Sequence, residues 1–191
     1  MTSQEVFFGE ISRRLDAAGI PFMVSGSLAS SLHGQPRATN AIDIVIDLDR
    51  TSLQAFVGSL PEEWYVSPDA ATDALRRRSV FNVIDTLSGM KVDLIVRKER
   101  AFSEVEFQRR RPGPVLGSTA PVTSPEDTIL SKLEWSKDGE SERQYRDALG
   151  VALLRWDELD RDYLTKWGQE LGVGHELARL LADAAAVRRP E

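Results

Sequence analysis

Apolar residues recur at two different spacings along the chain. Up to about residue 123, short apolar runs typical of strands alternate with amphipathic segments, and from about residue 124 the spacing is helical throughout. We expect strands at residues 22–24, 39–46, 64–66, 80–84 and 92–96. We expect a short helix that ends near His33 and longer helices at residues 4–18, 53–60, 69–78, 99–111, 125–137, 141–155, 157–171 and 175–187.

Residues that begin and end elements support these boundaries. Thr2 and Glu5 have the spacing of a capping box, and Gly19 is suited to end the first helix. The runs at 80–84 and 92–96 are joined by a turn containing Gly89, which predicts a β-hairpin. Pro112, Gly113 and Pro114 are expected to break the chain after the charged helix at 99–111.

The order of elements predicts an α/β (α+β) fold. A small mixed sheet flanked by helices is followed by a C-terminal helical bundle. We therefore expect a catalytic domain at residues 1–123 and a helical region at residues 124–191 that completes the active site.

Composition narrows the class of protein. The chain has 191 residues, 41% hydrophobic and 28% charged, with no cysteine and no apolar run near the ~18 residues that cross a bilayer. The N-terminus lacks the pattern of a secretory signal, so the expected location is cytoplasmic, without a membrane partner.

Charge is unevenly distributed. The net charge of −6 argues against nonspecific binding of polyanions over the whole surface. Two basic runs nevertheless predict a local nucleic-acid groove, and the alternative is that each run is solvated surface. The residues of these runs are Arg76, Arg77, Arg78, Arg109, Arg110 and Arg111.

The segment 22–49 carries the densest chemistry. Ser25, Gly26 and Ser27 follow a short strand and begin a helix, so backbone N–H groups there could bind anionic oxygens. Ala41 and Asp43 alternate on the next strand and share one face. A carboxylate on that face could bind Mg²⁺, which prefers one or two carboxylates together with substrate phosphates.

This arrangement resembles the nucleotidyltransferase superfamily, the DNA polymerase β-like fold, in which a Gly-Ser turn precedes an Asp-x-Asp pair. The form at residues 26–43 is most similar to the AbiEii/MenT group of toxin nucleotidyltransferases. The chain departs from the pattern where Ala41 stands in place of the first Asp. Either this carboxylate has been lost naturally or Ala41 is an inactivating substitution; the intact remainder of the motif favours substitution.

The resemblance assigns roles to further residues. It implies nucleotide binding by Gly26, Ser27, Arg37 and Thr39. It implies catalytic roles at positions 41, 43, 93, 132 and 147, with the metal bound by Asp43 and Asp93.

The residues alone leave alternatives at three of these positions. Asp93 could be a solvent-facing strand residue, and Asp85 competes with it for the third carboxylate. Lys132, within 124–135, could be an exposed helical lysine. Asp147 could instead pair with a neighbouring arginine on its own helix.

The implied reaction is transfer of a nucleoside monophosphate from an NTP to the 3′ acceptor end of tRNA, assisted by two Mg²⁺ ions. Such a toxin would block aminoacylation and translation and would have a cognate antitoxin, which could be kinase-like and phosphorylate Thr39. Two alternatives remain. The chain could be an MNT-type antitoxin that adenylylates a partner protein, or a catalytically dead module that binds a nucleotide or a partner.

Overall fold

The computed structural model describes residues 2–36, 39, 41–139 and 141–188, which form two compact units. The sheet unit comprises residues 1–25 and 39–122, and the helical unit comprises residues 26–38 and 123–191. Residues 26–38 thus pack with the C-terminal helices although they are distant from them in sequence. The functional division at residue 123 stays a prediction.

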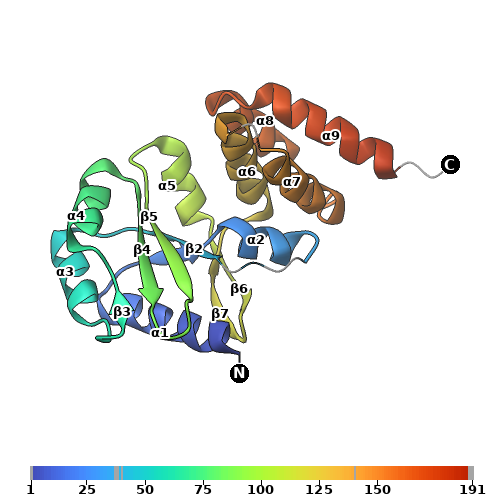
Figure 1. Ribbon diagram of the computed structural model, residues 1–191. Coiled ribbons are helices and arrows are strands. Elements are labelled where there is room, and N and C mark those ends of the chain that lie inside the picture. Colours follow the sequence, from blue (N-terminus) through green and yellow to red (C-terminus); the bar gives the residue numbers. More distant parts are fainter. Residues whose placement is uncertain (1, 37–38, 40, 140, 189–191) are drawn as a thin grey trace. The chain divides into compact units, whose positions relative to one another are not determined.

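The sheet unit is built on a mixed sheet, as predicted. Its described strands are β1 (Phe22–Val24), β2 (Ala41–Ile46), β3 (Trp64–Tyr65), β4 (Val80–Asp85), β5 (Lys91–Val96), β6 (Arg111–Val115) and β7 (Ser118–Val122). Their order across the sheet is β3-β4-β5-β2-β1-β7-β6 (Figure 1). The pairs β2–β5 and β1–β7 are parallel and the others antiparallel.

The helices of the sheet unit begin as their sequences predict. They are α1 (Ser3–Ala17), α3 (Arg50–Gly58), α4 (Pro68–Arg77) and α5 (Ala101–Gln108). The capping box of Thr2 and Glu5 is present, and the Asp49 carboxylate accepts a hydrogen bond from the Ser52 amide at 2.8 Å. These caps satisfy amide groups that the first turn of a helix leaves without a partner.

One face of the central strands is buried. Along β2 and β5 the even-numbered residues are buried and the odd-numbered ones are half-buried, as expected when side chains alternate. The helices α3 and α4 lie side by side near β3 and β4 (Figure 1). The half-buried face therefore carries the odd-numbered polar residues of β2 and β5.

The helical unit consists of α2 (Gly26–His33), α6 (Pro125–Gly139), α7 (Glu142–Leu154), α8 (Arg161–Glu170) and α9 (Gly174–Arg188). Its core is apolar and includes Ile129, Leu130, Val151, Leu164 and Leu180, all fully buried. The bundle expected from residue 124 is confirmed, with α2 as an addition that the sequence did not indicate.

Residues just after α2 lie directly against α7. A Cβ atom on Gly34 would stand 2.8 Å from the Val151 amide nitrogen and 2.9 Å from the Gly150 carbonyl carbon. Only glycine allows two backbones to approach this closely without displacing one of them. The His33 ring contributes a second attachment, since its Nε2 donates to the Thr123 carbonyl at 2.7 Å.

Two predicted helices are wrong in part. The segment 99–111 is helical only at Ala101–Gln108, and Pro112–Pro114 does not break the chain but lies within β6. Proline is tolerated there because β6 is an edge strand. The segment 157–171 becomes helical only at Arg161, where the Asp160 carboxylate accepts from the Tyr163 amide at 2.9 Å.

Among the described residues, no helix has both the length and the apolar character needed to cross a membrane.

Candidate functional site

The turn after β1 is hydrogen-bonded to the strand that carries Asp43. The Ser25 amide donates to the Asp43 carbonyl at 2.9 Å, which continues the β1–β2 pairing by one residue. Gly26 follows with φ +60°, a conformation that glycine adopts without strain, and begins α2. The turn therefore places the first amides of a helix immediately after a residue bonded to Asp43, as a phosphate-binding turn requires.

Two carboxylates stand side by side in the sheet. Asp43 on β2 and Asp93 on β5 are direct partners in the parallel register, so their Cα atoms are about 4.8 Å apart. The Asp93 carboxylate also accepts from the Asn82 amide group on β4 and lies 3.0 Å from the Lys91 Nζ. Like charges opposite one another destabilise a sheet, so this pair needs a cation nearby.

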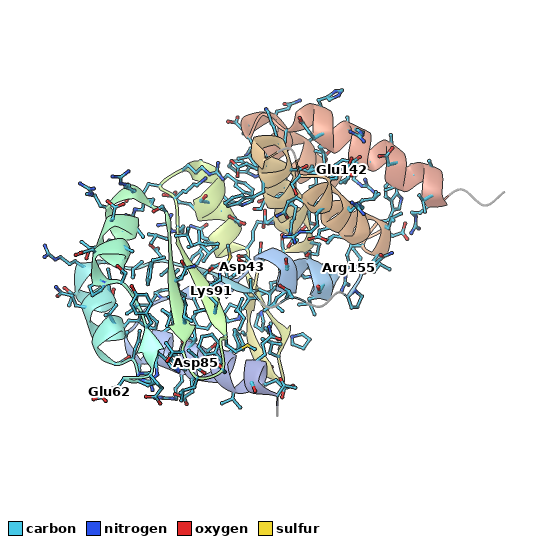
Figure 2. All side chains as sticks on the ribbon, in the orientation of Figure 1. Asp43, Glu62, Asp85, Lys91, Glu142 and Arg155 are labelled. Carbon is cyan, nitrogen blue, oxygen red and sulfur yellow. The ribbon has the colours of Figure 1, made fainter. Side chains whose placement is uncertain are left out.

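The neighbouring row of the same face holds no carboxylate. Ala41 on β2 is the register partner of Lys91 on β5, and Figure 2 labels Lys91 and Asp43 near the middle of the sheet. Asp85 lies at the turn end of β4, where its carboxylate accepts from the Leu87 amide at 3.0 Å. Asp93, and not Asp85, is therefore the register partner of Asp43.

The described residues fit one divalent ion better than two. They contain no group of three or more His, Cys, Asp or Glu side chains suited to hold a metal. Asp43 and Asp93 supply two carboxylates in adjacent positions, which is the protein contribution that Mg²⁺ usually has when substrate phosphates complete its coordination. An Asp at position 41 would add the carboxylate on which a second ion depends.

Thr39 lies before β2 and not within it. Its hydroxyl donates to the Ala41 carbonyl at 3.1 Å and accepts from the Ala41 amide at 3.3 Å. Its own carbonyl accepts from the Gln4 side chain at 3.0 Å. The expectation that Thr39 shares the strand face of Asp43 is therefore wrong, because the strand begins only at Ala41. Arg37 lies outside the described residues.

The helical unit contains a buried ion pair. The Lys132 Nζ on α6 lies 3.0 Å from an Asp147 carboxylate oxygen on α7 and 2.7 Å from the Gln144 side-chain oxygen. Lys132 is 5% exposed, unlike an ordinary surface lysine. The structure thus brings together Lys132 and Asp147, two residues that are 15 positions apart in the sequence.

The two basic runs lie in different parts of the sheet unit. Residues 76–78 precede β4, and residues 109–111 lead into β6, five strand spacings or about 24 Å across the sheet. Arg76 and Arg77 share the Asp73 carboxylate at 2.6 and 2.9 Å, and Arg78 pairs with Glu99. The two runs therefore do not form one continuous patch, and acidic neighbours offset much of the first.

Sequence reasoning missed three polar residues beside the predicted ones: Lys91, Asn82 and Gln144. Lys91 and Asp93 are two positions apart on one strand, so alternation alone indicated a shared face. The contact between Asn82 and Asp93 depends on the hairpin register, which local sequence does not determine. Gln144 stands three residues before Asp147, the spacing of neighbours on one helix face.

Comparisons with known proteins identify the fold. No protein-family model matches the chain, and no curated protein matches it. The structure is similar to that of an antigenic nucleotidyltransferase-like protein from Paracoccidioides brasiliensis, with a TM-score of 0.60, 16% identity, and coverage of 98% of this chain and 90% of that one.

It is also similar to the antibiotic-resistance factor ANT(2″)-Ia in two structures, each with a TM-score of 0.55 and 15% identity. The solution structure is matched over 97% of this chain and 95% of that one. The crystal structure in complex with adenylyl-2″-tobramycin is matched over 98% of this chain and 100% of that one. At these identities the likeness concerns the fold, which is nucleotidyltransferase-like.

Proposed function

We propose that the chain is a nucleotidyltransferase of the AbiEii/MenT toxin type, which transfers a nucleoside monophosphate to the 3′ acceptor end of tRNA. The observation that carries this proposal is the pairing of Asp43 with Asp93 on adjacent parallel strands, with the Ser25 amide bonded to the Asp43 carbonyl. Two aligned carboxylates beside a helix-initiating turn are suited to an NTP bound with a divalent ion.

In the proposed reaction, the acceptor hydroxyl oxygen attacks the α-phosphorus of the NTP. A new ester bond forms, the bond between the α-phosphorus and its bridging oxygen breaks, pyrophosphate leaves, and the hydroxyl proton passes to solvent. Mg²⁺ held by Asp43 and Asp93 would neutralise charge on the phosphates and lower the pKa of the attacking hydroxyl.

Residues of this chain have distinct roles in the proposal. The amides that follow Ser25 at Gly26 and Ser27 bind phosphate oxygens. Lys132, which Asp147 holds at 3.0 Å, supplies positive charge that stabilises the transition state. Ala41 leaves this form with too few carboxylates for efficient transfer, so we expect the chain as it stands to be nearly inactive.

Regulation of the proposed toxin would fall to a cognate antitoxin. A kinase-like antitoxin would phosphorylate Thr39, two residues before the carboxylate-deficient position 41. The added phosphate carries about −1.5 to −2 charges and would repel the NTP.

Other acceptors define the competing functions. An MNT-type enzyme would modify a partner protein, and an enzyme with a substrate like that of ANT(2″)-Ia would modify an aminoglycoside hydroxyl, as the bound adenylyl-2″-tobramycin of that neighbour suggests. A dead module would bind a nucleotide and transfer nothing. The tRNA acceptor is preferred because the resemblance at residues 26–43 and 124–151 is to the toxin group.

The test is a transfer assay with an acceptor panel. The Ala41→Asp variant is incubated with Mg²⁺, each of the four NTPs labelled at the α-phosphate, and bulk tRNA, tobramycin or a cell lysate cleared of nucleic acid. We expect label on tRNA with Ala41→Asp and little or none with the parent chain. Label on tobramycin or on protein alone would replace the acceptor. An inert variant with every NTP and acceptor would overturn the proposal.

A further inference from the structure

Lys91 is a cation paired directly with one member of the Asp43–Asp93 pair. It stands two residues before Asp93 on β5, so both side chains project from the same face. Its Nζ lies 3.0 Å from an Asp93 carboxylate oxygen, and its side chain is 42% exposed against 20% for Asp93. The ammonium group therefore lies where a metal ion bound to Asp93 would have its positive charge.

The register explains why Lys91 occupies this place. The parallel pairing sets Lys91 directly opposite Ala41, so the ammonium stem passes a methyl group and not a charged side chain. The two carboxylates and the Lys91 ammonium group together carry a net charge of −1. An Asp at position 41 would stand opposite Lys91 and raise the carboxylate count to three, which shifts the balance towards a divalent cation.

We propose that Lys91 is an internal cation that competes with the divalent metal for Asp43 and Asp93 and thereby sets metal affinity. This inference rests on the proposed function only in taking the two carboxylates as metal ligands. With Ala41, the ammonium group holds Asp93 in a charge-compensated, metal-free state. Metal binding must displace the 3.0 Å ion pair and bring a doubly charged ion close to a lysine.

The exposure of Lys91 limits the size of the effect. A partly exposed ion pair contributes little to stability, and the lysine can turn towards solvent when a metal arrives. The repulsion between the ammonium group and the metal persists at the distances that the flexible side chain allows. We therefore expect removal of this charge to tighten metal binding about three- to tenfold.

The experiment titrates Mn²⁺ alone into the full chain and measures unbound Mn²⁺ by electron paramagnetic resonance. The variants are Lys91→Met, Lys91→Arg and the control Lys98→Met, which removes an equal charge from an exposed position after β5. Lys91→Met should lower the Kd for Mn²⁺ about three- to tenfold, whereas Lys91→Arg and Lys98→Met should stay within about twofold of the parent. Lys91→Met combined with Asp43→Asn should lose the gain.

A Lys91→Met Kd equal to or weaker than that of the parent would overturn the inference, as would an equal gain in Lys98→Met. Ala41→Asp separates the two proposals. Mn²⁺ bound by Ala41→Asp and lost with Asp43→Asn, without any effect of Lys91→Met, refutes the role of Lys91 and leaves the metal site standing. No Mn²⁺ bound by any variant, Ala41→Asp included, refutes both.

Discussion

Removal of the Lys132 charge should destabilise the helical unit strongly. Lys132 and Asp147 have side chains only 6% and 10% exposed, and their charged atoms are 3.0 Å apart. Lys132→Ala would take the ammonium group away from a buried carboxylate and from the Gln144 side-chain oxygen. Breaking a buried pair from one side costs about 3–5 kcal/mol, which for a chain of this length lowers the melting temperature by roughly 6–20 °C.

The double variant separates the charge from the packing. Lys132→Met with Asp147→Leu removes both charges and keeps apolar volume, so its stability should return to within about 1 kcal/mol of the parent. Arg146→Ala is the control on the same helix. Arg146 and Glu142 form a pair at 3.6 Å with side chains 74% and 90% exposed, and its loss should cost less than about 1 kcal/mol.

Urea unfolding followed by tryptophan fluorescence is the suitable assay. Three of the four tryptophans, Trp135, Trp156 and Trp167, belong to the helical unit, so the signal reports mainly on that unit. A Lys132→Ala midpoint as close to the parent as that of Arg146→Ala would refute the buried pair. A double variant as unstable as Lys132→Ala would refute the charge argument and assign the loss to packing.

Three other predictions concern His33, the basic runs and Thr39. Burial lowers the pKa of His33, so the unfolded chain binds more protons below about pH 6.5 and stability should fall from about pH 7.5 to 5.5; equal urea-midpoint slopes in His33→Gln and the parent would exclude this. Neutralising residues 76–78 or 109–111 should flatten the salt dependence of tRNA binding by about 0.7–0.9 in log–log slope for each phosphate that the variant no longer neutralises, with NTP affinity unchanged; unaltered slopes in both would make the runs solvated surface. Co-expression with antitoxin should add one phosphate to Thr39 and silence Ala41→Asp; equal silencing of a Thr39→Val form of that enzyme, with no phosphate found, would disprove the modification.

The sequence predicted those parts of the fold that depend on local periodicity and capping. The helix at Ser3–Ala17 with its Thr2 cap and the hairpin turn with Gly89 at φ +71° are examples. It failed where tertiary context decides. Residues 111–115 contain two prolines and a glycine, which locally disfavour a strand, and they form one because an edge position leaves proline's missing amide without cost.

The candidate site shows the same division. Alternation and the resemblance indicated Asp43 and Asp93, and the register that pairs them is a tertiary fact. Thr39 was placed on the strand by extending the alternation two residues too far, past the point where its hydroxyl bonds the Ala41 backbone. Lys91 was missed because a lysine at a strand end is ordinary until the parallel partner strand sets it opposite Ala41.

The fate of the two ends of the triphosphate tests the central claim most directly. Ala41→Asp and the combined Ala41→Asp, Asp43→Asn variant are incubated with Mg²⁺, tRNA and NTP labelled at either the α- or the γ-phosphate. Nucleotidyl transfer predicts α-label on the tRNA 3′ end and γ-label in pyrophosphate in equal amounts, both lost with Asp43→Asn. Label from the γ-phosphate on the acceptor, α-label only in free nucleotide, or transfer that survives Asp43→Asn would contradict the account.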